Sequence, residues 1–447
     1  MSRPTLQTNL KDKHVVVVGA GGSGLAAARL ALSAGARVTV NDLAHKDPAL
    51  LPPGAAGHFG DHPDALFQAA DLVVLSPGVP PLPPVVRAQA AGIEVVAEVE
   101  LALRFIDAGI GAVTGTNGKS TTVSLLGDLL AATGRPAFSG GNLGTPLSDV
   151  VGTPAGGPDG LISLELSSFQ LEHITSLRSR VAALLNLTED HLDRYDSFEH
   201  YCRTKLRVFQ NDPAAVVYNA DDPLVVAGVA DVAAPKHAFS VRSTAAAFHL
   251  DDGVLRFPDF GLAVPARDLR LTGRHMMANA LAAVGTALLM GVPADAVPPV
   301  LTTFSGLPHR MSFCGEVGGV RFYDDSKATN VGSVEGSLAG WDTPYVLLLG
   351  GRHKGAPYTP LIPVLKTGCR AVVVLGEAAP LIRADLDGHL PLHVAASFDD
   401  AVRQGAALAQ PGDAVILSPA CSSYDMFDNY KQRGDRFAAL VRDLATP

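Results

Sequence analysis

The chain has 447 residues, of which 47% are hydrophobic and 18% are charged, and its formal net charge at pH 7 is −9. This length is typical of about three domains with a large buried core, and the acidic balance argues against a nucleic-acid partner or an anionic membrane surface. No apolar run reaches the ~18 residues that a membrane span needs, the N-terminus lacks the apolar core of a signal peptide, and the four cysteines form no Cys-x-x-Cys pair, so we expect a cytoplasmic globular protein.

The N-terminal segment alternates strands and helices as a parallel α/β sheet does. Residues 13–18 form an apolar strand, a glycine turn follows at 19–24, and a helical pattern over 25–34 leads to a second strand at 37–42. The turn fits Gly-x-Gly-x-x-Gly with Asp42 about 20 residues further on, which suits a dinucleotide or a nucleotide diphosphate at the helix N-terminus. A glycine turn that serves only helix–strand packing is the alternative interpretation.

Two more strands continue this pattern, at 71–78 and at 93–96. The first of them ends in Ser76, Pro77 and Gly78. Because ligands of open α/β sheets bind at the carboxyl ends of the strands, this turn is a second candidate contact for the same ligand.

The stretch 112–122 is the most informative part of the chain. An apolar strand ends in the loop GTNGKST at 115–121, and a helical pattern begins directly after it. The glycines let the backbone N–H groups turn toward phosphate oxygens, Lys119 adds a cation, and a Ser or Thr hydroxyl can ligate Mg²⁺. The strict P-loop pattern has glycine where this chain has Val113, so the match is to a shorter loop. An ordinary glycine-rich turn is the alternative.

Polar residues suited to metal and phosphate chemistry follow this loop. Glu165 ends an apolar strand, where a carboxylate is costly to bury unless a cation meets it. The segment 186–195 places polar groups after another buried strand, although a solvated helix start would look similar. Taken alone, His191 is more typical of a structural histidine, and Lys205 looks like an ordinary exposed helix lysine.

The rest of the chain is predicted to form a β-rich tract over 214–271, a helix over 276–290 and a third alternating α/β region. We therefore expect three α/β domains, over 1–98, 99–306 and 307–447.

Three polar segments of the last domain each follow an apolar strand, at 323–330, 350–355 and 418–427. Together they supply lysines, hydroxyls and an acid, which suits recognition of a small dicarboxylate or of phosphate. Cys421 lies between small residues without a His–Asp signature, so we interpret it as a packing residue.

These motifs closely resemble those of the Mur ligase family, and the resemblance covers essentially the whole chain. Its most specific parts lie at 115–121, 165–170, 190–195, 325–330 and 418–434. The resemblance implies a three-domain α/β architecture, with an N-terminal Rossmann-like UDP-binding domain, a central P-loop ATPase-type domain and a C-terminal Rossmann-like domain. The Asp-Asn-Pro-Arg signature of the family members that add a diamino acid is absent.

The resemblance further implies ATP-driven amide formation in peptidoglycan precursor synthesis. A monomer in the cytoplasm would add D-glutamate to UDP-N-acetylmuramoyl-L-alanine through an acyl phosphate, using ATP and two Mg²⁺ sites, with no nucleic-acid or membrane partner. Three alternatives stay open: another amino-acid-adding Mur ligase, an NAD-dependent oxidoreductase built on the turn at 19–24, and a non-catalytic nucleotide-sensing or scaffold protein.

Site residues carried over by motif follow from the same resemblance. Ser120 and Glu165 would ligate one Mg²⁺, and His191 and Lys205 would serve the second, with Lys205 carboxylated on its side-chain nitrogen. The implied catalytic residues are Lys119, His191, Lys205, Lys327 and Lys354. The implied ATP contacts are Gly115, Thr116, Asn117, Gly118, Lys119, Ser120, Thr121, Asn279, Arg310 and Asp325. The implied contacts of the UDP-linked substrate are Ser23, Asp42, Ser76, Pro77, Gly78 and Asn142. The implied D-glutamate contacts are Thr329, Lys354, Ser423 and Tyr430, and Lys327 is implied with them at D-glutamate or the phosphates.

Overall fold

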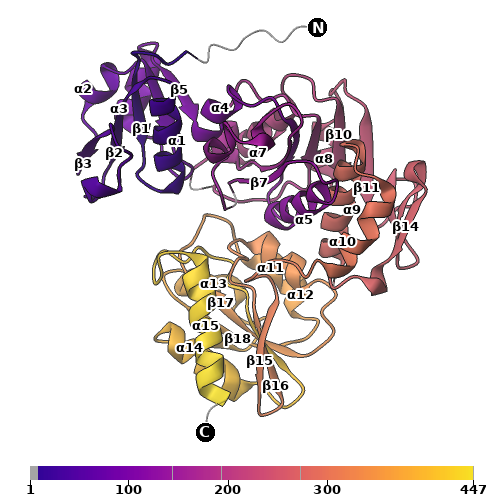
Figure 1. Cartoon of the computed structure of the whole chain (residues 1–447). Coiled ribbons are helices and arrows are strands. Elements are labelled where there is room, and N and C mark those ends of the chain that lie inside the picture. Colours follow the sequence, from indigo (N-terminus) through magenta and orange to yellow (C-terminus); the bar gives the residue numbers. More distant parts are fainter. Residues whose placement is uncertain (1–8, 143, 193, 272, 446–447) are drawn as a thin grey trace. The chain divides into compact units, whose positions relative to one another are not determined.

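A computed structural model describes residues 9–142, 144–192, 194–271 and 273–445 of the chain (Figure 1). The N-terminal segment without a signal-peptide pattern and Asp193 of the 190–195 motif lie outside the described residues. None of the helices in the described part is long and apolar enough to cross a membrane.

The chain folds into two compact units. The bulk of unit 1 is the chain up to Leu187, together with Tyr201–Leu269 and Ala278–Thr303. Unit 2 comprises Thr188–His200, Arg270–Met277 and the chain from Phe304 onward.

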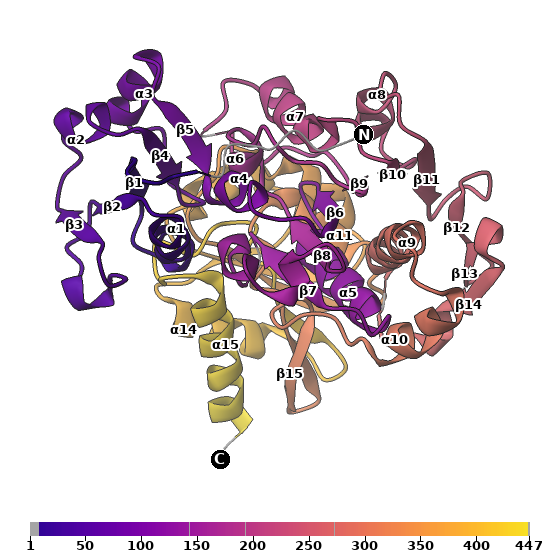
Figure 2. The same cartoon turned by 45° about the horizontal axis from the view of Figure 1, so that its top comes forward.

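The first sheet of unit 1 is parallel throughout, as the alternating pattern predicted. Its strand order is β3-β2-β1-β4-β5. Alternate residues of β1 face opposite cores: Val15 and Val17 pack with helix α1, while Val16 and Val18 pack with the side of α2 and α3. Figure 2 shows α1 on one face and α2 and α3 on the other. The elements are β1 (His14–Val18), α1 (Gly22–Ser33), β2 (Arg37–Asp42), β3 (Ala56–Phe59), α2 (Asp64–Gln68), β4 (Leu72–Leu75), α3 (Pro83–Ala90) and β5 (Glu94–Ala97).

The second sheet of unit 1 has nine strands in the order β14-β13-β12-β11-β10-β9-β6-β8-β7. The strands from β7 to β12 are parallel, whereas β13 and β14 form antiparallel pairs at one edge. The strands are β6 (Gly109–Thr114), β7 (Ala137–Gly141), β8 (Leu161–Glu165), β9 (Val181–Leu184), β10 (Ala215–Asn219), β11 (Lys236–Ser240), β12 (Phe248–Asp251), β13 (Val254–Phe257) and β14 (Leu262–Pro265). The helices of this region are α4 (Glu98–Leu103), α5 (Lys119–Ala131), α6 (Ser168–Leu171), α7 (Phe198–Leu206), α8 (Pro223–Gly228), α9 (Arg274–Leu289) and α10 (Val297–Thr303).

Unit 2 is built on a six-stranded sheet of order β15-β16-β20-β17-β18-β19, in which only the β15–β16 pair is antiparallel. Alternate residues of β17 again face two cores: Leu347 and Leu349 lie in one, Val346 and Leu348 in the other. The elements are β15 (Ser312–Val317), β16 (Val320–Asp324), α11 (Val331–Leu338), β17 (Tyr345–Gly350), α12 (Ile362–Leu365), β18 (Cys369–Leu375), α13 (Ala379–Leu386), β19 (Leu392–Val394), α14 (Phe398–Leu408), β20 (Ala414–Leu417) and α15 (Tyr430–Ala445).

The predicted α/β class is therefore confirmed, and it is built on three sheets in the described residues. The antiparallel edge strands were not predicted, because a strand pattern by itself does not give the direction of pairing. What matters for the site is that every predicted polar turn follows the carboxyl end of a parallel strand, where ligands of such sheets bind.

Candidate active site

The loop 115–118 joins β6 to α5. Its last residue, Gly118, has no room for a side chain. Gly118 adopts a φ of +84°, and a Cβ there would lie 2.2 Å from Oδ1 of Asn279. Only glycine therefore fits, and Asn279 of α9, which the resemblance implies as an ATP contact, lies directly against the loop. Because α5 begins at Lys119, the partial positive charge of its N-terminus is placed where phosphate would bind.

Asn186 holds this loop in shape, although it was not singled out from the sequence. Its backbone oxygen accepts from Thr116 N at 3.0 Å, and its side-chain Oδ1 accepts from Asn117 N at 2.7 Å. Its Nδ2 donates back to the Asn117 carbonyl at 3.1 Å. The available signal is an amide near the end of the predicted apolar strand 181–187, which by itself indicates only the start of a polar segment.

Two lysines converge on the carbonyl of Gly115. Lys119 Nζ donates to it at 2.9 Å and to the Thr116 carbonyl at 2.7 Å, while Lys205 Nζ donates to it at 2.8 Å. Lys205 is only 1% exposed and lies 4.8 Å from the ring centre of Tyr201. The composition-based view of Lys205 as an exposed lysine is therefore wrong. Two cations that share one carbonyl repel each other, so an anion beside them is favoured.

Glu165 ends β8, the neighbour of β6, and is 2% exposed. Its Oε1 accepts from Asn142 Nδ2 at 2.8 Å, whereas its Oε2 has no partner among the described residues. An unpaired buried carboxylate oxygen is costly, so this oxygen fits a role as a cation ligand. The hydroxyls of Thr121 and Thr122, also buried in this region, have no partner within the described residues either.

In the described part of the chain, no three His, Cys, Asp or Glu side chains gather into a metal-binding group. Mg²⁺ commonly takes one or two carboxylates and completes its shell with phosphate oxygens and water. The donor set here, one buried carboxylate beside the phosphate loop, fits that pattern and not a site made of protein ligands alone.

The glycine turn of the first sheet lies at the switch point between β1 and β4. A Cβ on Gly24 would lie 1.8 Å from the Gly19 carbonyl, so the turn needs glycine there. Asp42 Oδ2 accepts from Ala20 N at 2.8 Å, and Ser76 Oγ donates to the Gly19 carbonyl at 3.3 Å. The turn at 19–24, Asp42 and the Ser76 turn are thus brought together, with Ser23 in the first turn of α1. Pro77 and Gly78 complete a turn that the Val79 N–H closes onto the Ser76 carbonyl.

In unit 2, Asp325 follows β16 and is fully buried. Its Oδ2 accepts from Ser418 Oγ at 2.7 Å, and its Oδ1 accepts from Met311 N at 3.3 Å. Burial raises the pKa of Asp325 to about 6, against the lowering effects of Ser418 and of the nearby Arg310 guanidinium. Arg310 and Asp325, both predicted at ATP, are therefore close enough to interact.

Asp190 binds a residue from each of two predicted polar segments of unit 2, Lys354 and Asn330. Its Oδ1 accepts from Lys354 Nζ at 3.0 Å, and its Oδ2 accepts from Asn330 Nδ2 at 3.0 Å. Burial would raise the pKa of Asp190, but Lys354 and the adjacent His191 outweigh it and lower the pKa to about 2. His191 has a φ of +55°, a left-handed conformation that is uncommon outside glycine. Lys354, expected at D-glutamate, is thus held by an internal carboxylate.

Of the remaining predicted residues of unit 2, Lys327 lies beside Tyr430. Lys327 Nζ is 5.1 Å from the centre of the Tyr430 ring, and the Thr329 N–H donates to the Lys327 carbonyl at 2.9 Å. Ser423 is buried, and its carbonyl accepts from the Phe427 N–H at 2.8 Å.

Arg433 ties the loops of this region together and was missed in the sequence. It is 1% exposed, and its guanidinium donates to both oxygens of Ser326 at 2.9 and 2.8 Å. It also reaches the carbonyls of Cys421 and Ser422 at 3.2 and 3.4 Å. Burial lowers the pKa of Arg433 to about 10. Cys421 itself is fully buried, which agrees with the packing role predicted for it.

Family models and full-length relatives match most of the chain. Family models match residues 13–97 (Mur ligase MurD-like, N-terminal domain), 113–287 (Mur ligase middle domain) and 309–421 (Mur ligase, glutamate ligase domain). A UDP-N-acetylmuramoylalanine–D-glutamate ligase from Geobacter metallireducens is 42% identical and covers 98% of this chain and 99% of its own. One from Trichlorobacter lovleyi is 43% identical and covers 97% of this chain and 100% of its own.

Solved structures share the fold at low sequence identity. A pseudomurein peptide ligase type C from Methanothermus fervidus has a TM-score of 0.63 at 17% identity and covers 97% of this chain and 100% of its own. The MurF ligase from Thermotoga maritima in complex with ADP has a TM-score of 0.61 at 16% identity and covers 98% of this chain and 97% of its own. With the full-length relatives above 40% identity, these matches establish that the chain belongs to the Mur ligase family.

Proposed function

We propose that the chain joins D-glutamate to UDP-N-acetylmuramoyl-L-alanine at the expense of ATP, a step of peptidoglycan precursor synthesis. The observation that carries the proposal is the phosphate loop, where Lys119 and Lys205 share the Gly115 carbonyl. Full-length relatives named for this activity support the choice of substrates. Membership of the Mur ligase family leaves the oxidoreductase alternative without support.

The reaction has two steps. The substrate carboxylate attacks the γ-phosphorus of ATP, ADP leaves, and an acyl phosphate forms. The amine of D-glutamate then attacks the acyl carbon, phosphate leaves with the electron pair of the broken C–O bond, and the amine loses a proton. The first step is needed because a carboxylate is a poor electrophile, and the protein contributes mainly positioning and charge neutralisation.

Lys119 and the loop 115–121 would bind the ATP phosphates. Asn279 against the loop, and Arg310 with Asp325 in unit 2, would contact the rest of the nucleotide. Ser120 and Glu165 would hold one Mg²⁺, and the unpartnered Oε2 of Glu165 supports this role. Bound Mg²⁺ would neutralise the charge that develops on the phosphates.

Lys205 would take part in a second metal site with His191. We propose that the Lys205 ammonium first loses one proton, and that the free amine then attacks CO₂ and loses a second proton, which converts a cation into a carbamate anion able to ligate Mg²⁺. Its burial beside the loop supports this role, since the modified group would be shielded from bulk water.

The polar turns at the other two sheets would bind the remaining substrates. Ser23, Asp42 and the turn Ser76–Gly78 would contact the UDP part, and Asn142 the acyl end. The D-glutamate contacts would be Thr329, Lys354, Ser423 and Tyr430, with Lys327 at D-glutamate or the phosphates. We also propose the domain division 1–98, 99–306 and 307–447, and a monomer acting in the cytoplasm.

The deciding experiment is phosphate release from ATP with UDP-N-acetylmuramoyl-L-alanine and Mg²⁺. We expect release with D-glutamate and little with D-aspartate, L-glutamate or meso-diaminopimelate. Release that does not depend on D-glutamate, or that is fastest with meso-diaminopimelate, would contradict the proposal and favour another member of the family.

A further inference from the structure

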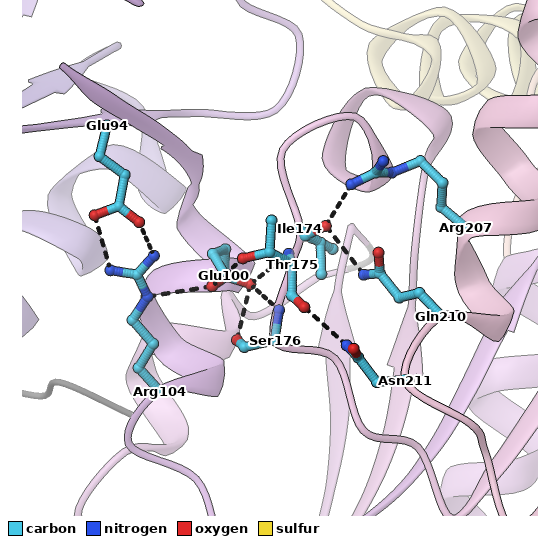
Figure 3. A network of polar contacts seen from close by, with 9 residues as sticks. All are labelled: Glu94, Glu100, Arg104, Ile174, Thr175, Ser176, Arg207, Gln210 and Asn211. Atoms are coloured by element: carbon cyan, nitrogen blue, oxygen red, sulfur yellow. Dashed lines mark hydrogen bonds and ion pairs between the residues drawn. The ribbon is translucent and has the colours of Figure 1, made fainter. Parts of the chain in front are cut away.

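The carboxylate of Glu100, on the short helix α4 after the first sheet, accepts five hydrogen bonds (Figure 3). Thr175 and Ser176 each donate their backbone N–H at 2.9 Å and their hydroxyl at 3.1 and 2.9 Å. Arg104 Nε donates the fifth at 3.2 Å. Glu100 is 1% exposed, so these hydrogen bonds take the place of the water molecules that would otherwise solvate its carboxylate.

The peptide groups that donate to Glu100 are bound again at their other end. The Ile174 carbonyl shares its peptide group with the Thr175 N–H, and it accepts from Arg207 Nη2 at 2.7 Å and from Gln210 Nε2 at 3.0 Å. The Thr175 carbonyl, in the next peptide group, accepts from Asn211 Nδ2 at 2.7 Å. Two consecutive peptide groups therefore lie between an anion and a set of donors that includes a guanidinium, as Figure 3 shows.

This arrangement orients the peptide dipoles favourably at both ends. The N–H ends point at the negative Glu100, and the carbonyl of Ile174 points at the positive Arg207. Hydrogen bonds to charged groups are stronger than neutral ones, and bonds in a chain polarise one another. The segment 174–176 is thus held by hydrogen bonds to the charged groups of Glu100 and Arg207, in addition to packing.

The Arg207 end of this bridge leads to the candidate active site. Arg207 comes two residues after Lys205, whose Nζ donates to the Gly115 carbonyl of the phosphate loop. Arg207 Nε also donates at 2.6 Å to the carbonyl of Leu171, the last residue of the helix that follows Glu165. The bridge therefore connects α4 with the helix that carries Lys205 and with the turn behind Glu165.

We propose that Glu100 is a positioning residue for the ligase reaction. Glu100 acts through the peptide groups 174–176 and Arg207. These contacts hold Lys205 in place beside the phosphate loop. The inference rests on the proposed function, because it takes Lys205 as a group that acts at the phosphates. Glu100 itself is not placed at any substrate.

The first test compares three neighbouring carboxylates. Glu100→Gln removes the charge, and in either orientation its NH₂ group faces an N–H donor, so at least one bond from Thr175, Ser176 or Arg104 is lost and the others lose their charged acceptor. We expect kcat to fall about 10- to 100-fold, as small displacements of catalytic groups do, with the KM values for ATP and D-glutamate little changed. Glu98→Gln, on the same helix and equally buried, and Glu94→Gln, on the exposed side of Arg104, serve as matched controls that keep the wild-type kcat. An equal loss in all three variants would overturn the proposal.

A double-mutant cycle tests the connection itself. Arg207→Lys keeps the charge but replaces the two nitrogens that reach Leu171 and Ile174 separately by one nitrogen on a flexible stem, so its kcat should fall in the same way as that of Glu100→Gln. If both act through one bridge, the double variant is no slower than the slower single variant. Losses that multiply would show two independent effects and refute the bridge.

Hydrogen exchange provides a readout that does not need turnover. In Glu100→Gln, amide exchange should rise in residues 201–211 as well as in 171–177, whereas Glu94→Gln should change neither. A rise confined to 171–177 would mean that Glu100 supports only its own loop. Should Glu100→Gln fail to fold, Arg207→Lys carries the same measurement, read at residues 171–177. If the wild type has no ligase activity but the variants show the predicted exchange pattern, the proposed function is refuted, whereas the structural connection between Glu100 and Arg207 is supported.

Discussion

Glu98 is a buried acid whose removal we expect to stabilise the protein. Its Oε1 accepts from the Ser148 N–H at 2.7 Å, but its Oε2 has no partner among the described residues. Burial raises its pKa from 4.5 to about 7, more than the bond from Ser148 lowers it, and the nearby Asp149 adds to the rise. The perturbation is Glu98→Gln, which removes the charge and keeps an oxygen for Ser148.

The sign follows from the raised pKa. Below pH 4.5 the acid is protonated in both the folded and the unfolded chain, so it contributes no pH-dependent penalty. As the pH rises toward 7, the unfolded chain releases the proton while the folded chain retains it, and stability is lost. Above pH 7 the full penalty is on the order of 3 kcal/mol for a pKa that moves from 4.5 to about 7. The glutamine variant does not carry this penalty.

The assay is urea denaturation of the wild type and of Glu98→Gln at several pH values between 5 and 8.5. We expect the two curves to lie close together at pH 5 and the variant to be more stable by about 2 to 3 kcal/mol at pH 8. Glu94→Gln, at a side chain 53% exposed, is the control and should show no such trend. A stability difference for Glu98→Gln that is independent of pH, or that favours the wild type at pH 8, would refute the reasoning.

Three substitutions test the proposed site, each against phosphate release from ATP. Lys119→Ala should abolish release, because the loop loses the cation that binds the phosphates, and retained turnover would remove the phosphate-loop assignment. Lys205→Ala should be nearly inactive and partly restored by short carboxylic acids; normal activity without them would rule out the carboxylated lysine. Lys354→Met should raise the KM for D-glutamate, but by less than the tenfold or more that a whole charge-assisted bond of about 1.5 to 3 kcal/mol would give, because the ligand takes the lysine from Asp190. An unchanged KM would place D-glutamate elsewhere.

The parts of the site that depend on local chain geometry could be predicted from the sequence. The loop 115–118 and the acid Glu165 each end an apolar strand, and the carboxyl ends of parallel strands lie at one edge of a sheet. Their neighbourhood therefore follows from the strand pattern alone. The glycine turn at 19–24 and its partner Asp42 are predictable for the same reason.

Residues that act across long sequence distances could not be found in this way. Lys205 is buried because α7 packs Tyr201 and Thr204 as well as the lysine inward, and such a face has no apolar periodicity to detect. Arg433 is on a helix whose sequence shows an ordinary basic residue, yet its partners are loop carbonyls at Ser326 and Cys421. Glu100 likewise needs residues about 75 positions away, and only tertiary contacts reveal that.

At Lys354, the proposed contact of D-glutamate, the existing ion pair with Asp190 would make ligand binding an exchange of one carboxylate for another. The incoming ligand gains only the difference between the two ion pairs, so a second anchoring point on the ligand has to supply most of the selectivity. Acetate, citrate and other carboxylate buffers carry the same functional group. They should therefore act as weak competitors of D-glutamate, and kinetic work on this protein calls for a buffer without carboxylates.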